Sequence, residues 1–119
     1  MTIWNEVITE ISKIIYKGEI QSRLILASMI SRGHVLIEDK PGTGKTKLSK
    51  IISTISSLET KRIQCTVDML PTDIIGFEFY DRKKGNFTFR KGPIFTNILL
   101  ADELNRASPK SQSALLQAM

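Results

Sequence analysis

The clearest chemical signal in this sequence is a lysine and a threonine that follow a short loop with two glycines, Gly42 and Gly44. Gly42 and Gly44 let the backbone close on an anion, so that amide N–H groups can point at phosphate oxygens. Lys45 would then reach the β- and γ-phosphates of a nucleotide, and the Thr46 hydroxyl would bind Mg²⁺. The residues expected to surround the nucleotide phosphates are Asp39, Lys40, Pro41, Gly42, Thr43, Gly44, Lys45, Thr46 and Lys47.

Asp39 departs from the general pattern of such loops, G-x-x-x-x-G-K-[ST], which begins with a glycine. A carboxylate that pointed inward there would face a polyanionic ligand. We expect it to point outward, because aspartate tolerates turn conformations better than most residues other than glycine. The alternative interpretation of the segment is a glycine-rich turn before an ordinary helix, without a ligand.

Two adjacent carboxylates, Asp102 and Glu103, follow the apolar run 98–101. Asp102 would hold Mg²⁺, usually through water, and Glu103 would polarise the water that attacks the nucleotide. Taken alone, an apolar run ending in two acids marks a solvated strand end equally well. Its position 56 residues after Thr46 favours the catalytic interpretation, with Glu103 and Lys45 as catalytic residues and Thr46 and Asp102 as metal ligands.

These residues need a strand before the loop and a helix after it. Residues 35–37 form a short apolar run between turn residues, which predicts a strand buried on both faces. From residue 45 to residue 55 the apolar residues recur at helical spacing. Two more helices are predicted upstream, over residues 3–17 and 20–31, and the second carries its apolar row at Ile20, Leu24, Ala27 and Ile30.

Downstream, apolar and polar residues alternate over residues 62–67, which predicts a strand with Ile63, Cys65 and Val67 facing the core. Residues 77–80 and 87–90 predict a hairpin in which Gly85 supplies the positive φ of the turn. Residues 98–101 predict a fully buried strand. Ser108 and Pro109 predict the start of a last helix, as its N-cap and first helical residue.

Length and composition point to one domain with a modest core. The chain has 119 residues, of which 41% are hydrophobic, and a formal charge of +5 that is spread along the sequence. Its single cysteine, Cys65, fits a reducing compartment. Neither a leader peptide nor an apolar run long enough to span a membrane is found, so we expect a soluble cytoplasmic protein.

The sequence resembles the MoxR family of AAA+ ATPases over nearly its whole length. The segments that carry the resemblance are residues 33–46, 70–76, 92–107 and 111–119. The resemblance implies an α/β, three-layer αβα P-loop core, with the hairpin around residues 77–90 as an insertion that faces a partner or a pore. It also implies ATP and Mg²⁺ as ligands, a homo-oligomeric ring and chaperone-like remodelling of a protein client that the sequence does not identify.

Further roles follow from the same resemblance. Gly18 and Glu19 would lie near adenine, and Thr66 would hydrogen-bond Glu103 until a partner binds. Arg106 is interpreted as a helix-entry or subunit-interface residue, and a structural salt bridge and a role in catalysis remain equal alternatives for it. His34 is expected to be structural. The basic residues of the hairpin suit an exposed edge better than nucleic acid, which makes a nucleic-acid partner an unfavoured alternative; they are Arg82, Lys83, Lys84, Arg90 and Lys91.

In that family a sensor strand, an arginine finger and a helical lid follow the second carboxylate motif. Residues 1–119 are therefore expected to form a partial core, with a slot of roughly 9.6 Å, two strand spacings, between strands 35–38 and 98–101. Three hypotheses remain. The first is an ATPase completed by further segments, and the second is a nucleotide-binding module without hydrolysis. A P-loop kinase or nucleic-acid-dependent ATPase is disfavoured, because no acceptor pocket or base-stacking surface is evident.

Overall fold

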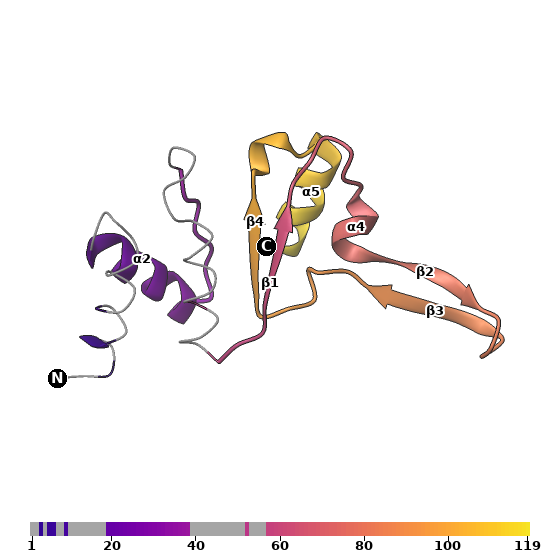
Figure 1. Ribbon diagram of the computed structural model, residues 1–119, viewed down its shortest axis with the longest axis horizontal. Helices are drawn as coiled ribbons and strands as arrows, with labels where there is room; N and C mark the ends of the chain where they lie inside the picture. The colour runs from indigo at the N-terminus through magenta and orange to yellow at the C-terminus, as the bar shows by residue number, and fades with distance from the viewer. Residues whose placement is uncertain (1–2, 4, 7–8, 10–18, 39–51, 53–56) are drawn as a thin grey trace. The chain divides into compact units, whose positions relative to one another are not determined.

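The computed structural model describes residues 3, 5–6, 9, 19–38, 52 and 57–119, and the chain forms two compact units (Figure 1). The first unit comprises Met1–Ser57 and the second Leu58–Met119. The predicted helix 45–55, apart from Ile52, and most of the predicted helix 3–17 lie outside the described residues. None of the helices within the described ranges is both long and apolar enough to cross a membrane.

Helix α2 of the first unit spans Glu19–Ile30 and confirms the predicted second helix. It ends in a Schellman-type turn, in which Gly33 N–H donates to the Ser28 carbonyl at 2.8 Å and Arg32 takes the left-handed conformation with φ 54°. The predicted apolar row is exposed, and the buried residues are instead Ile25 and Leu26. Apolar residues occur on every side of this helix, so their spacing could not select the buried face.

Residues 33–38, which follow α2, have no regular secondary structure, so the prediction of a buried strand over residues 35–37 is wrong for this structure. Val35, Leu36 and Ile37 are 46%, 72% and 38% exposed. A strand of a parallel sheet is stabilised by hydrogen bonds to a neighbour on each side. Among the strands that the structure describes, none pairs with this segment.

The second unit is built on two parallel strands, β1 (Thr60–Gln64) and β4 (Ile98–Asp102). Their register runs from Thr60 opposite Ile98 to Gln64 opposite Asp102, so both carboxyl ends lie at one edge. The predicted strand 62–67 thus starts and ends earlier, and Val67 is 74% exposed. β4 is half-buried throughout rather than fully buried, because β1 is its one strand partner in the described part of the chain.

The antiparallel hairpin of β2 (Gly76–Asp81) and β3 (Asn86–Lys91) extends away from the β1–β4 pair (Figure 1). Its turn has the predicted positive φ at Gly85, which is +67°. The Asp81 side chain stabilises the turn by accepting hydrogen bonds from the backbone N–H groups of Lys83 and Lys84, at 2.9 and 3.3 Å. The predicted pairing of the two aromatic-rich segments is therefore observed.

Helix α4 (Pro71–Ile75) was not predicted. Its signals are a proline at the first helical position and an aspartate two residues later. The Asp73 carboxylate accepts a hydrogen bond from the Leu70 backbone N–H at 2.8 Å, which satisfies a donor at the start of the helix. Ile74 of this short helix is fully buried.

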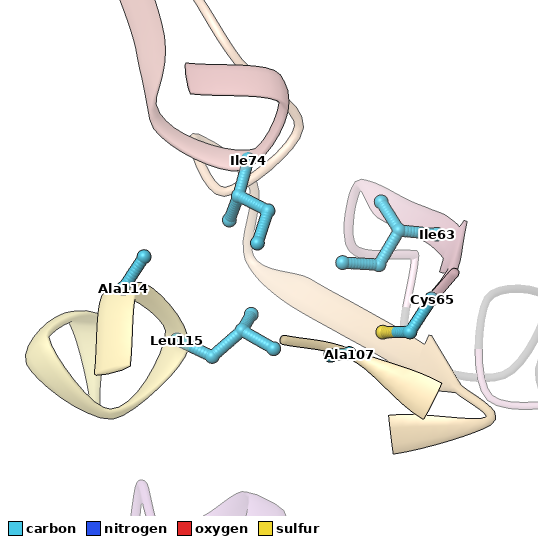
Figure 2. Close-up of a cluster of buried hydrophobic side chains, with 6 residues drawn as sticks. All are labelled: Ile63, Cys65, Ile74, Ala107, Ala114 and Leu115. Atoms are coloured by element: carbon cyan, nitrogen blue, oxygen red, sulfur yellow. The ribbon is translucent and has the colours of Figure 1, made fainter. Parts of the chain in front are cut away.

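Helix α5 (Pro109–Ala118) begins as predicted, because the Ser108 hydroxyl accepts a hydrogen bond from the Ser111 N–H at 3.3 Å. The buried Ser111 hydroxyl donates to the Met69 carbonyl at 2.6 Å and ties α5 to the segment after β1. Six side chains gather into the core of this unit (Figure 2): Ile63, Cys65, Ile74, Ala107, Ala114 and Leu115. This core anchors the carboxyl ends of β1 and β4 against the helices.

Candidate functional site

Asp102 is the last residue of β4 and Glu103 is the next residue, so both lie at the carboxyl end of the parallel pair. This is the edge at which α/β proteins with parallel sheets bind their ligands. The strand pairing continues for one residue beyond β1, since Cys65 N–H donates to the Asp102 carbonyl at 2.8 Å. This hydrogen bond holds the Asp102 carbonyl, directly after the Cα atom that carries the carboxylate side chain.

Both oxygens of the Asp102 carboxylate accept a hydrogen bond. Oδ2 lies 2.6 Å from Nη2 of Arg62, on β1, and Oδ1 accepts from the Glu103 backbone N–H at 3.1 Å. The Asp102 side chain is 23% exposed and that of Arg62 is 40% exposed. Sequence reasoning missed Arg62, because only the strand register shows that it lies close to Asp102.

Glu103 has a left-handed backbone, with φ 56° and ψ 44°. This conformation costs a residue other than glycine about 1–2 kcal/mol, so it must be held by neighbouring contacts. Two are present: the Glu103 N–H donates to Asp102, and its carbonyl accepts from Arg106 N–H at 2.9 Å at the start of the 3₁₀ turn η1 (Leu104–Arg106). The Glu103 side chain is exposed to solvent, where a water molecule can reach it.

Cys65 and Thr66 follow β1, and Cys65 lies beside Asp102. Burial raises the pKa of the Cys65 thiol above its usual value, and the negative charge of Asp102 raises it further. The thiol therefore stays protonated near neutral pH and acts as a packing residue. Thr66 is exposed and lies two residues beyond the end of β1. Among the described residues, no hydrogen bond joins it to Glu103, so the predicted contact is not formed here.

The other half of the predicted site, residues 39–47 with Lys45 and Thr46, lies outside the described residues, as does Gly18. Arg106 and His34 are both exposed. Within the described ranges, no ion pair of Arg106 is found. The structure thus brings together Asp102, Glu103 and Arg62, and it leaves the placement of the phosphate loop as a prediction.

The donor set at Asp102 fits a magnesium ion. Mg²⁺ prefers hard oxygen ligands and keeps several waters, and it is commonly bound by one or two carboxylates together with substrate phosphates. A carboxylate has about four lone-pair positions, so the two hydrogen bonds at Asp102 leave room for waters of a hydrated ion. No cluster of three or more His, Cys, Asp or Glu side chains suited to a metal occurs among the described residues.

Residues 34–119 match the profile of the ATPase family associated with various cellular activities (AAA). The chain therefore belongs to this family, and the mixed arrangement of helices and strands agrees with the predicted α/β P-loop fold. A crystal structure of a candidate ATPase from Cytophaga hutchinsonii superposes with a TM-score of 0.71 at 41% identity, over 95% of this chain and 34% of that protein.

The resemblance to MoxR proteins is confirmed by curated relatives. The chain is 41% identical to chaperone MoxR1 of Mycobacterium tuberculosis over 94% of its length. It is 51% identical to the uncharacterised protein YeaC of Bacillus subtilis over 81% of its length. In both cases the match covers 30% of the relative, so the chain spans less than a third of these proteins.

Proposed function

We propose that this protein binds ATP with Mg²⁺ and hydrolyses it, and that the hydrolysis cycle drives chaperone-like remodelling of a partner protein. The observation that carries the proposal is the pair Asp102 and Glu103 at the carboxyl end of β4, in a chain of the AAA family. The similarity to chaperone MoxR1 supports the remodelling role.

Each residue has a distinct task in this proposal. Lys45 and the backbone of residues 39–47 bind the phosphates, and Thr46 and Asp102 hold the metal. Mg²⁺, when bound, supplies positive charge that offsets the charge on the phosphates. Glu103 orients and polarises a water whose oxygen attacks the γ-phosphorus, while the bond from that phosphorus to the ADP oxygen breaks. The exposed side chain of Glu103 and its neighbour Asp102 lie at the same edge, as this division of labour requires.

We further propose that residues 1–119 form the N-terminal part of an AAA+ core, which works in a homo-oligomeric ring together with a sensor strand, an arginine finger and a lid. The hairpin β2–β3 is the candidate insertion that contacts a partner, because aromatic side chains are exposed along both of its strands. The single cysteine, which is buried and unpaired, supports a location in the reducing cytoplasm.

A thermal shift experiment tests nucleotide binding. Mg-ATP at a hundred times its dissociation constant should stabilise the folded protein by about 2.7 kcal/mol and raise its melting temperature. Lys45→Ala should lose this increase, whereas Lys84→Ala, in the hairpin turn, should keep it. A melting temperature that Mg-ATP leaves unchanged, or raises equally in the wild type and Lys45→Ala, would contradict the proposal. Binding without turnover in the assembled protein would favour the alternative of a nucleotide-binding module.

A further inference from the structure

The ion pair between Arg62 and Asp102 has no assigned role in the proposed function. Arg62 belongs to β1 and Asp102 to β4, and Nη2 lies 2.6 Å from Oδ2. The contact therefore spans the two strands and ends on the carboxylate proposed to hold magnesium.

Stability alone is a weak reason for this pair. The side chains are 40% and 23% exposed, and an ion pair in contact with solvent contributes little to the free energy of folding because water screens the charges. Its geometric effect is larger. A guanidinium is a rigid planar donor, so it fixes the direction of the oxygen that it contacts.

The second oxygen of Asp102 completes the restraint. Oδ1 accepts from the Glu103 backbone N–H at 3.1 Å. One oxygen is therefore held by a donor on β1 and the other by a donor directly after β4. The carboxylate can then turn only if one of these hydrogen bonds breaks. The same contact also restrains the left-handed backbone of Glu103, since its N–H is the donor.

We propose that Arg62 is a positioning residue that aims the Asp102 carboxylate at magnesium and, through the other oxygen of Asp102, steadies the backbone of Glu103. This inference rests on the proposed function. Arg62 itself contacts neither nucleotide nor metal in this scheme. It acts on the ligand next to the metal, and partners of metal ligands commonly change metal affinity about 10- to 100-fold when they are removed.

The test measures nucleotide binding rather than activity. The dissociation constant of ATP is determined in the complete natural protein with Mg²⁺ and with EDTA. The constant in EDTA divided by the constant in Mg²⁺ gives a ratio that reports the contribution of the metal. Arg62→Ala should lower this ratio about tenfold and leave the affinity in EDTA unchanged. Arg62→Lys keeps the charge without the planar fork and should lie in between. Lys61→Ala is the matched control, because Lys61 has similar exposure on the same strand and pairs with Glu59.

Melting temperatures without nucleotide verify that the variants fold, and Arg62→Gln replaces Arg62→Ala if the latter does not. We expect Arg62→Ala to lower the ratio about tenfold. A ratio that stays within about twofold of the wild-type value would show that the ion pair is only structural. A ratio that rises would show that Arg62 competes with the metal, and either result overturns the inference. If the wild-type protein binds ATP equally well with Mg²⁺ and with EDTA, the proposed function and this inference are both wrong.

Discussion

At the scale of single residues, the site is a chain of contacts that begins at Arg62, passes through Asp102 and ends at Glu103. The location of the two acids could be predicted from the sequence, because an apolar run followed by acidic residues marks the end of a strand. Arg62 could not be predicted. Its closeness to Asp102 depends on how β1 and β4 align, and that register is a property of the strand pair rather than of either strand alone.

Cys65 provides a test of the electrostatics beside the site. Its folded-state pKa is raised, so the thiol form stabilises the folded state below the unfolded pKa of about 8.5, and this contribution is lost as the pH rises toward the folded pKa. At pH 7 the wild type should be more stable than Cys65→Ala by about 1 kcal/mol, a typical value for a point mutation. The difference should shrink above pH 8.5. Urea unfolding at pH 7 and pH 9.5 measures it, and a constant difference would contradict the raised pKa.

At the scale of elements, the structure agrees with sequence reasoning wherever the signal is local. The hairpin turn at Gly85 and the Ser108 cap of α5 are determined by residues within four positions of each other. The strand predicted over residues 35–37 has no such local determinant, because a buried strand exists only with partners on its edges. The buried face of α2 could likewise not be predicted, because this helix carries apolar residues on every side.

The base of the hairpin offers a test at this scale, because the backbone passes very close to itself there. A Cβ atom added to Gly92 would lie 2.2 Å from the Ile74 carbonyl oxygen and 2.6 Å from the Gly76 nitrogen. Both atoms belong to the backbone, so the backbone at Gly92 and the backbone of residues 74–76 would have to move apart. Gly92→Ala should therefore lower the free energy of unfolding by about 3 kcal/mol, at the upper end of the cost of overpacking.

Gly85→Ala is the control for the hairpin variant. Gly85, unlike Gly92, has a positive φ, and nothing lies within 4 Å of an added Cβ atom there. The control should cost only about 1 kcal/mol, which is the penalty for an alanine in the left-handed region. Equal losses for the two variants in urea unfolding would show that the close approach at Gly92 does not stabilise this part of the fold.

At the scale of the whole molecule, the chain is a member of the AAA family, and its match covers 30% of the length of chaperone MoxR1 and of YeaC. Family membership could be predicted because the loop, the carboxylates and the segments around them occur together in one order. Residues 39–47 lie outside the described part of the chain, so the arrangement of phosphate loop and carboxylates stays a prediction. The central claim is therefore that Asp102 and Glu103 have different tasks in one ATP site.

The most direct test of that claim compares ATP binding and ATP turnover in Glu103→Gln and Asp102→Ala of the complete protein. Glu103→Gln keeps the shape of the side chain but loses its charge, so Mg-ATP affinity should stay near the wild-type value while turnover falls at least about 100-fold. Asp102→Ala removes a metal ligand, so it should also weaken binding in Mg²⁺ and leave binding in EDTA unchanged. Equal losses of affinity in both variants, or turnover that survives Glu103→Gln, would contradict the account.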